Sequence, residues 1–331
     1  MTSSNDTIIQ VEDFTIDYLD QKTWVNIANR VSFSIAPGET LGLAGESGCG
    51  KTTMGFSLFG YQRPGSRIRS GSVIFEGLDL LKLNDRELQP IRGAKIFMVP
   101  QNPASTLTPS MRVGRQVVET LQSHHITAGR KEAEGKTLKI FAQVGLPRPE
   151  DVFKRYPHEL SGGQQQRVVI AIALACEPKL VVMDEPTTAL DVTTQARILR
   201  LLNSLKNEYG LSVLFITHNL GVLAQICDRL AVMYAGELVE VAPTVELFKN
   251  PRHPYTRGLI AAVPRLNQPN DGKEKLQGLL RRDELPAGCR FAPRCGYALP
   301  KCFSDSQTLA TVGQDHQAAC WRWEHVKEEA G

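Results

Sequence analysis

A glycine-rich stretch carries the first chemical signal in this sequence, Gly45-Glu46-Ser47-Gly48-Cys49-Gly50-Lys51-Thr52. It has the pattern G-x-x-x-x-G-K-[ST] of a phosphate-binding loop. The glycines let successive backbone N–H groups turn toward an anion, and a helix expected over residues 51–59 adds the partial positive charge of its N-terminus. Lys51 is expected to bind the β- and γ-phosphates of a nucleotide, and the Thr52 hydroxyl is expected to bind Mg²⁺. The apolar run before the loop and the helix after it favour this interpretation over an ordinary glycine-rich turn.

An adjacent pair of carboxylates, Asp184 and Glu185, is the second signal, and it ends the apolar run of residues 180–183. Asp184 is suited to the shell of a Mg²⁺ ion through a bound water. Glu185 is one residue further out, where its carboxylate would polarise a water in line with a γ-phosphate. Alone, an Asp-Glu-Pro sequence after a strand is more often a solvated turn. The phosphate-binding loop upstream favours the catalytic interpretation.

Four short apolar runs are expected to position these groups. Runs of four or five residues rich in Val, Ile and Leu are typical of strands buried on both faces of a parallel sheet. Ligands bind such sheets beyond the carboxyl ends of the strands, so the groups that follow the runs should meet at one edge. The runs are residues 41–44, 95–99, 180–183 and 213–216, and they lead into Gly45, Gln101, Asp184-Glu185 and His218 respectively.

Length and composition describe an ordinary globular chain with room for two domains. The sequence has 331 residues, of which 42% are hydrophobic and 22% charged, and its net charge of +3 is too small to indicate a nucleic-acid partner. No apolar stretch reaches about 18 residues without a charge, and the polar N-terminus with Asp6 is unlike a signal peptide. We therefore expect a cytosolic chain that meets any membrane through partners.

A third motif, Leu160-Ser161-Gly162-Gly163-Gln164, matches the signature sequence of the ABC ATPases, and the chain resembles that family. In physical terms, Ser161 and Gly163 would lie at a helix N-terminus that offers a hydroxyl and free N–H groups to an anion. In the family this turn contacts the nucleotide of a partner ATPase, so that two subunits enclose two ATP molecules.

The other elements of the family follow in the expected order. The resemblance implies that Gln101 is the Q-loop residue, that Thr188-Ala189-Leu190-Asp191 is the D-loop and that His218 is the switch histidine. Tyr18 stands where the family has an aromatic ring that stacks on adenine, although a strand aromatic packed inward explains it nearly as well.

Together the motifs and the resemblance define the expected site residues. Catalysis is assigned to Lys51, Gln101, Glu185 and His218. Nucleotide binding is assigned to Tyr18, Gly45, Glu46, Ser47, Gly48, Cys49, Gly50, Lys51, Thr52, Thr53, Gln101 and Asp184. Contact with a partner's nucleotide is assigned to Ser161, Gly162, Gly163, Gln164 and Asp191. The expected ligands are ATP and Mg²⁺, with Mg²⁺ held by Thr52, Gln101 and, through water, Asp184.

The resemblance also implies the fold, an α/β P-loop NTPase of the ABC ATPase type with a RecA-like core. Alternating polar and apolar positions before about residue 100 predict an antiparallel β-subdomain. Residues 102–178 are expected to form a helical subdomain, with helices over 116–124 and 131–144, and the core is expected to resume at residue 180. We expect a nucleotide-binding domain over residues 1–250 and a small cysteine-rich C-terminal domain over 251–331.

Four of the seven cysteines are clustered after residues 267–283, a polar stretch typical of a linker. Cys289, Cys295, Cys302 and Cys320 have the spacing C-x5-C-x6-C-x17-C. A cytosolic chain argues against disulfides. Zinc sites usually contain a close C-x2–4-C pair, which is absent here, although His316 would be a possible further ligand. Iron–sulfur clusters accept wider spacings.

This C-terminal part resembles the extension of the oligopeptide, dipeptide and nickel importer ATPases. Members of that group with all four cysteines look like [4Fe–4S] carriers. The resemblance therefore favours a [4Fe–4S] cluster, with Zn²⁺ as the alternative and free thiols as the remaining interpretation.

The sequence thus predicts the ATP-hydrolysing subunit of a binding-protein-dependent importer for peptides or related small solutes. The resemblance implies a second ATPase subunit (a sister chain), two membrane permease subunits and an extracytoplasmic solute-binding protein. It places the chain peripherally on the cytoplasmic face of the bacterial inner membrane. The alternative is a non-transport ATPase acting on a soluble complex, such as a carbon–phosphorus lyase accessory ATPase. A regulatory module without turnover is disfavoured because Glu185 and His218 are both present.

Overall fold

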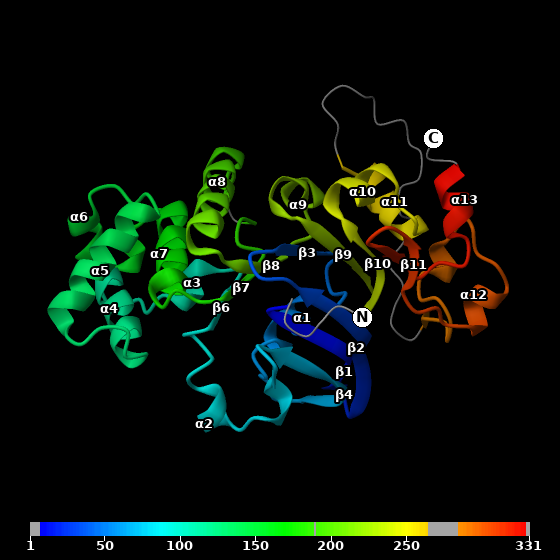
Figure 1. Ribbon diagram of the computed structural model, residues 1–331, viewed down its shortest axis with the longest axis horizontal. Coiled ribbons are helices and arrows are strands. Elements are labelled where there is room, and N and C mark those ends of the chain that lie inside the picture. The colour runs from blue at the N-terminus through cyan, green and yellow to red at the C-terminus, as the bar shows by residue number, and fades with distance from the viewer. Residues whose placement is uncertain (1–6, 189, 264–283, 329–331) are drawn as a thin grey trace.

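The structure, a computed structural model, describes residues 7–188, 190–263 and 284–328 (Figure 1). Asp6, Ala189 and the expected linker over residues 267–283 lie outside this part of the chain. The centre is an eight-stranded sheet in the order β11-β12-β10-β9-β3-β8-β7-β6. Its strands are β3 (Thr40–Ala44), β6 (Ile96–Val99), β7 (Leu180–Asp184), β8 (Ser212–Ile216), β9 (Arg229–Tyr234), β10 (Glu237–Pro243), β11 (Ala310–Gly313) and β12 (His316–Ala318).

Five neighbouring strands of this sheet, from β9 to β6, are parallel, and four of them position the candidate site. β3 pairs with β8, β8 with β7, and β7 with β6, each in parallel register. Every residue of β3, β7 and β8 is buried, as expected for strands covered on both faces. The predicted parallel sheet is confirmed, and the carboxyl ends of these four strands share one edge.

A second sheet is antiparallel, as the alternating pattern predicts. Its order is β2-β1-β4-β5, and its strands are β1 (Ile9–Asp20), β2 (Thr23–Ile35), β4 (Ser66–Phe75) and β5 (Leu78–Asp79). Helix α1 (Lys51–Ser57) contributes Met54 to a hydrophobic core that also holds Phe14 of β1 and Leu214 of β8. This helix is therefore packed between the two sheets, and it ends before residue 59, where the chain approaches the left-handed turn at Gly60 (φ +59).

A helical lobe extends from the β6 end of the central sheet (Figure 1). Its helices are α3 (Pro103–Thr106), α4 (Val113–Ser123), α5 (Arg130–Gln143), α6 (Pro149–Phe153) and α7 (Gly162–Ala175). The helices predicted over 116–124 and 131–144 are α4 and α5. α4 begins earlier than predicted, because Val113 starts the buried stripe that Val117 and Leu121 continue.

α7 combines a polar first turn with an apolar body. Ser161 caps it, since its Oγ accepts the N–H of Gln164 at 3.4 Å and its own N–H donates to Oε1 of Gln164 at 3.0 Å. All residues from Val168 to Ala175 are buried, so the body of the helix lies inside the molecule. The cap leaves the signature turn at the surface while the body fixes its position.

Most of the remaining helices cover the central sheet and its C-terminal end, whereas α2 lies at the bottom of the view in Figure 1, on the side of the antiparallel sheet. Figure 1 shows α8 and α9 over one side of the sheet, with α1 and the antiparallel sheet on the other. These helices are α2 (Asp85–Leu88), α8 (Val192–Tyr209), α9 (Leu220–Ile226), α10 (Thr244–Lys249), α11 (Pro254–Ala261), α12 (Lys301–Ser304) and α13 (Trp323–Glu328). Short 3-10 turns are η1 (Leu80–Lys82), η2 (Pro157–Glu159) and η4 (Ala292–Arg294).

The C-terminal segment, residues 284–328, continues the central sheet. β12 pairs antiparallel with β10, and β11 pairs with β12. A buried pair fixes the junction, because Nε2 of His316 lies 2.7 Å from Oε1 of Glu240. Glu240 also accepts the backbone N–H groups of Arg252 (2.6 Å) and His253 (3.0 Å). The segment therefore shares both a sheet and buried polar contacts with the rest of the molecule.

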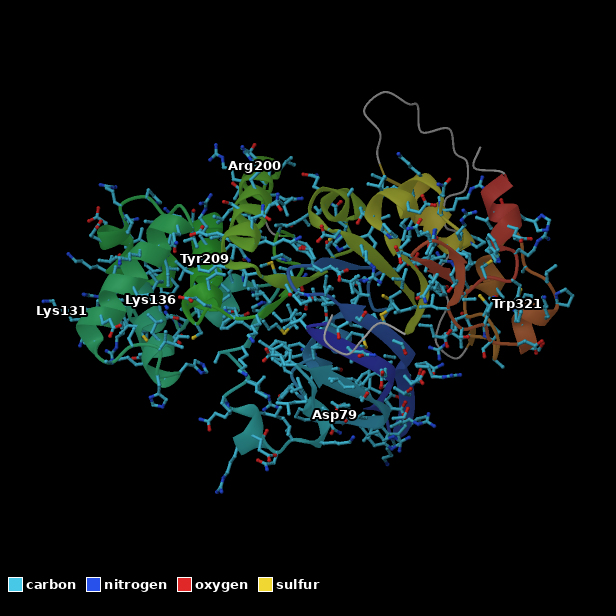
Figure 2. All side chains as sticks on the ribbon, in the orientation of Figure 1. Asp79, Lys131, Lys136, Arg200, Tyr209 and Trp321 are labelled. Carbon is cyan, nitrogen blue, oxygen red and sulfur yellow. The ribbon has the colours of Figure 1, made fainter. Side chains whose placement is uncertain are left out.

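Figure 2 shows the two ends of the molecule, with Lys131 and Lys136 on the helical lobe and Trp321 on the C-terminal segment. Across residues 7–188, 190–263 and 284–328, none of the helices has the length and apolar character that crossing a bilayer requires.

Gly114 of α4 provides a test of the packing in the helical lobe. A Cβ at this position would overlap the ring of Phe153, which closes the lobe from α6. We expect Gly114→Ala to lower the free energy of unfolding by about 1–3 kcal/mol through overpacking. Gly135→Ala in α5 is the matched control, because nothing lies within 4 Å of its added Cβ, and it should stabilise by about 0.5–1 kcal/mol. Urea unfolding of both variants measures the difference, and equal effects would contradict the packing described here.

Candidate functional site

The phosphate-binding loop connects β3 to α1 and is held by left-handed glycines. Gly45 has φ +151 and Gly50 has φ +108, so a side chain at either position would be strained. A Cβ on Gly45 would also overlap the carbonyl oxygen of Met233 in β9. Lys51 is buried at the start of α1, and its Nζ donates to the carbonyl oxygens of Gly45 (2.8 Å) and Glu46 (2.9 Å). The lysine therefore lies inside the curve of the loop, as the motif predicts.

Thr52 and Asp184 meet across the gap between α1 and β7. The Thr52 hydroxyl donates to Oδ1 of Asp184 at 3.1 Å. Burial raises the pKa of Asp184, and the hydrogen bond from Thr52 and the charge of Lys51 oppose that effect without cancelling it. A hydroxyl and a buried carboxylate in contact form a suitable oxygen pair for Mg²⁺. The structure brings together two of the three predicted magnesium residues.

The carboxylate of Glu185 forms hydrogen bonds with three side chains. Nδ1 of His218 lies 2.8 Å from its Oε1, while Gln101 (2.9 Å) and Thr188 (3.0 Å) donate to its Oε2. Burial acts to raise the pKa of this carboxyl, but the hydrogen bonds and charge of His218, with the Thr188 hydroxyl, lower it below its ordinary value. Glu185 is therefore held ionised, and Gln101 contacts this carboxylate rather than Thr52 or Asp184.

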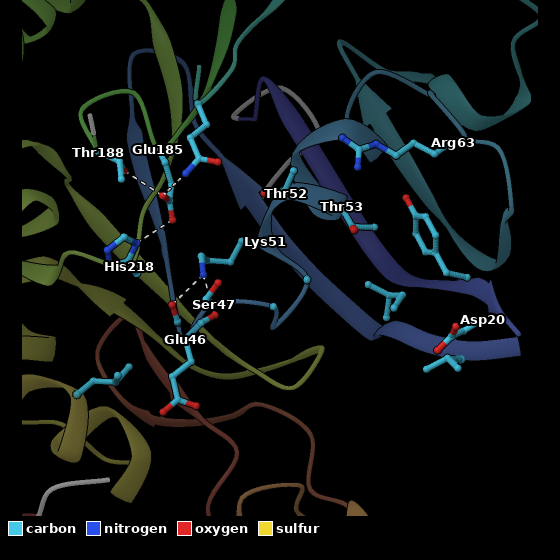
Figure 3. A pocket seen from close by; sticks show the side chains of 18 residues that line it. Asp20, Glu46, Ser47, Lys51, Thr52, Thr53, Arg63, Glu185, Thr188 and His218 are labelled. Atoms are coloured by element: carbon cyan, nitrogen blue, oxygen red, sulfur yellow. Dashed lines mark hydrogen bonds and ion pairs between the residues drawn. The ribbon is translucent and has the colours of Figure 1, made fainter. Parts of the chain in front are cut away.

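These groups open into one large cavity of about 940 Å³ between the two sheets (Figure 3). Its lining contains ten of the twelve residues that the sequence assigns to nucleotide binding, including Tyr18. The two exceptions are Asp184, which lies behind Thr52, and Cys49, whose Sγ packs inward near Nζ of Lys51. The lining residues are Tyr18, Asp20, Val25, Ile27, Gly45, Glu46, Ser47, Gly48, Gly50, Lys51, Thr52, Thr53, Arg63, Gln101, Glu185, Thr188, His218 and Leu259.

Six of these lining residues were not among the site residues assigned from the sequence. Val25 and Ile27 are two residues apart in β2, so their side chains lie on the same face of the strand. Val25 pairs with Tyr18 of β1, and this pairing brings both residues to the cavity. Arg63 lies over the Phe56 ring at 3.9 Å, and its charge acts on Asp184. Thr188 belongs to the predicted D-loop, so its motif was recognised but its contact with Glu185 was not. The others are Asp20 and Leu259, for which no local sequence signal exists.

The signature turn and Asp191 lie away from this cavity. Ser161, Gly162, Gly163 and Gln164 form the cap and first turn of α7, and none of them lines the cavity of its own chain. Asp191 caps α8 by accepting the N–H of Thr194 at 3.0 Å, and this hydrogen bond lowers its pKa. The first turns of α7 and α8 are in close contact, because a Cβ on Gly163 of α7 would lie 2.8 Å from Cγ2 of Thr194 in α8.

The four C-terminal cysteines line a second, small cavity of about 20 Å³, beside His253, Phe291 and Trp321. Burial raises the pKa of Cys289 to about 11 and that of Cys320 to about 12, and neighbouring cysteines add to the effect. None of the four forms a disulfide within the described part of the chain.

His316 is not a member of this group. It was considered as a zinc ligand, but its ring binds Glu240 inside the sheet junction, because β12 directs it there. Within the part of the chain that the structure describes, no three His, Cys, Asp or Glu side chains converge closely enough to hold a single metal ion. His316 therefore does not serve as the possible further ligand of the zinc alternative.

Comparison with known proteins agrees with this geometry. The sequence profile of the ABC transporter family matches residues 28–188, and that of the C-terminal region of oligopeptide and dipeptide transporters matches residues 239–302. A probable peptide ABC transporter ATP-binding protein, y4tR of Sinorhizobium fredii, is 41% identical over 97% of this chain and 96% of its own. The oligopeptide transport ATP-binding protein AppD of Bacillus subtilis is 40% identical over 98% and 99% respectively.

Solved structures support the same assignment. A dimeric ATP-binding cassette in a post-hydrolysis state, bound to ADP and phosphate, superposes with a TM-score of 0.64 and 29% identity. The match covers 71% of this chain and 98% of the cassette. The chain therefore belongs to the ABC transporter family, among the ATP-binding subunits of the oligopeptide and dipeptide transporters, and it is an ATPase of that family.

Proposed function

We propose that this chain binds and hydrolyses ATP to drive the import of peptides through a membrane permease. The observation that carries the proposal is the convergence of Gln101, Thr188 and His218 on the ionised Glu185, at the cavity that the phosphate-binding loop lines. A carboxylate held ionised beside a phosphate site is the arrangement that a general base for water requires.

Each residue has a role that follows from its position. Lys51 lies inside the loop and is suited to neutralise the β- and γ-phosphates. Thr52 and, through water, Asp184 would hold Mg²⁺, which supplies charge neutralisation to the phosphates, with Gln101 joining them after it leaves Glu185. Glu185 accepts the proton of the attacking water, and His218 keeps its carboxylate oriented. Tyr18, which lines the same cavity, would stack on the adenine ring.

The signature turn is proposed to act on a second ATPase subunit. Ser161 and Gly163 offer a hydroxyl and a helix N–H group beside Gln164, where an anion binds favourably. They lie outside the cavity of their own chain, so a partner's nucleotide is the anion they would meet in a head-to-tail dimer. Gly162 and Asp191 belong to the same surface. A sister chain is the expected partner.

We further assign residues 1–250 to the nucleotide-binding domain and 251–331 to the C-terminal extension. The two matched profiles, over residues 28–188 and 239–302, support two parts of the chain, and the proposed boundary lies inside the second match. The proposed assembly contains two permease subunits and an extracytoplasmic solute-binding protein, with this chain on the cytoplasmic face of the membrane. An importer subunit should copurify with permeases from detergent extracts, whereas an ATPase of a soluble complex should not.

Replacing Glu185 tests the assignment of the base. Glu185→Gln keeps the size and hydrogen-bonding capacity of the side chain but removes its proton affinity. We expect ATP binding to be retained and kcat to fall by roughly 10²- to 10⁴-fold. Glu208→Gln, on the exposed face of α8, is the control and should hydrolyse ATP like the wild type. Undiminished turnover in Glu185→Gln would refute the assignment.

The acid limb of the pH profile tests the contact with Thr188. The folded pKa of Glu185 is depressed, so its ionised form persists above that pKa and activity is lost as the pH falls through it. Thr188→Val removes one donor, so the pKa of Glu185 should rise and this limb should move to higher pH. Thr188→Ser keeps the hydroxyl and should leave the limb in place. Measuring kcat of both variants from acid to neutral pH tests this prediction. Identical pH profiles for the two variants would mean that Thr188 does not stabilise the Glu185 carboxylate.

We also propose that the four C-terminal cysteines hold a [4Fe–4S] cluster. Each sulfur receives a nearby backbone N–H, namely those of Phe291, Tyr297, Leu299 and Arg322 for Cys289, Cys295, Cys302 and Cys320 respectively. Donors aimed at sulfur stabilise thiolates bound to metal. Four cysteines that line one cavity, each with a backbone donor at its sulfur, match the number of thiolate ligands that such a cluster takes, and Zn²⁺ is the alternative.

Metal analysis tests this assignment without any measurement of activity. Protein purified without oxygen should contain iron and sulfide and show broad visible absorption. Cys302→Ser should lose most of the iron, whereas Cys176→Ala, at the buried end of α7, should keep it. Wild-type protein that contains zinc alone, or no metal, would contradict the cluster.

A further inference from the structure

An arginine of the cysteine-bearing segment binds the phosphate-binding loop directly. Arg294, in the turn η4, donates from Nη1 to Oε2 of Glu46 at 2.9 Å and from Nη2 to Oε1 at 3.0 Å. The two parallel hydrogen bonds form a forked ion pair, the geometry in which arginine binds carboxylate most strongly. The arginine side chain is only 6% exposed and that of Glu46 is 24% exposed, so solvent screens the pair weakly.

A second contact fixes the backbone of the same loop residue. The N–H of Glu46 donates to the Tyr255 hydroxyl at 2.9 Å, and Tyr255 is fully buried in α11. The rings of Tyr255, Tyr234 and Phe291 pack together with centroids 4.6–5.4 Å apart. Nη1 of Arg294 also donates to the Tyr234 hydroxyl at 3.2 Å. The fork of Arg294 is thus held by a rigid aromatic cluster.

The direction of the Glu46 side chain has an electrostatic consequence. Glu46 is an acidic residue on the loop whose N–H groups receive the phosphates, and it contributes to the lining of the cavity. Figure 3 shows its carboxylate pointing away from Lys51, toward the C-terminal segment. A carboxylate without a counter-ion at this position would repel the triphosphate across a partly buried space. Arg294 both cancels this charge and holds it away from the phosphates.

We propose that Arg294 is a positioning residue of the ATP site, through which the C-terminal segment sets the affinity for ATP by neutralising and orienting Glu46. The inference rests on the proposed function, since it takes ATP as the occupant of this cavity. It adds a role for the extension that does not depend on which group its cysteines bind.

The experiment combines Arg294→Met with Glu46→Gln in the full chain and measures the Kd for a fluorescent ATP analogue, with KM and kcat alongside. Arg294→Met leaves Glu46 charged and unpaired, so Kd and KM should rise about tenfold while kcat falls less than about twofold. In the Glu46→Gln background no charge is left to neutralise, and the same arginine substitution should change Kd by less than about twofold. Binding is thus rescued by removing an acidic group, which a merely structural role would not predict.

Arg290→Met is the matched control. Arg290 lies in the same segment and binds the Ala235 carbonyl, Asn26 and Glu237, so its loss disturbs the segment without touching the phosphate-binding loop. It should leave the Kd for ATP near the wild-type value. Arg294→Lys retains the charge but not the fork and should give an intermediate Kd, so it decides the question if Arg294→Met does not fold.

The outcomes separate this inference from the function on which it rests. Equal losses of affinity for Arg294→Met in the wild-type and Glu46→Gln backgrounds, or a wild-type Kd for both Arg294 variants, would overturn the role of Arg294 while ATP binding by the wild type stands. A wild-type chain that binds no ATP would overturn the proposed function and this inference with it. A large loss of ATP affinity in Arg294→Met that is absent when Glu46→Gln is also present would support the inference.

Discussion

Parallel pairing of four buried strands is the constraint on which the site depends. β3, β8, β7 and β6 run in the same direction side by side, so the residues after them arrive at one edge of the sheet. Lys51, Glu185 and His218 are far apart in the sequence, and the parallel pairing of the strands before them brings them close together. The pairing in turn needs close packing, because a Cβ on Gly42 of β3 would lie 2.5 Å from Leu230 in the neighbouring strand. The geometry of the catalytic groups is therefore a consequence of the apolar core beneath them.

Adjacent carboxylates in this site have opposite electrostatic tendencies. The pKa of Asp184 is raised, mainly by burial, and that of Glu185 is lowered by its hydrogen bonds and by His218 despite burial. When the surroundings shift the pKa values of two neighbouring acids in opposite directions, the two acids are suited to different chemical roles. Asp184 favours the arrival of a cation, which would relieve the cost of its buried charge. Glu185 is stabilised as an anion, which is the protonation state that its proposed role as a base requires.

Local patterns in the sequence predicted the parts of the site that local structure determines. The phosphate-binding loop, the four strands and the cap at Ser161 each depend on a few neighbouring residues, and all three were predicted. Contacts that depend on strand pairing or on distant segments were not. Val25 reaches the cavity because β2 pairs with β1, and Leu259 reaches it from α11. His316 was named as a possible ligand of the zinc alternative, but the pairing of β12 with β10 directs its ring to Glu240.

The C-terminal segment is best understood as a support for the nucleotide site rather than as an appendage. It extends the central sheet through β12, and an arginine of η4 binds the acidic residue of the phosphate-binding loop. Cys295 follows Arg294 directly in the chain, and the N–H of Cys295 closes the same turn by donating to the Ala292 carbonyl at 3.1 Å. Any group that fixes the cysteine sulfur therefore fixes the turn from which the guanidinium projects. The cysteine site and the phosphate-binding loop are thus joined through one short turn and one forked ion pair.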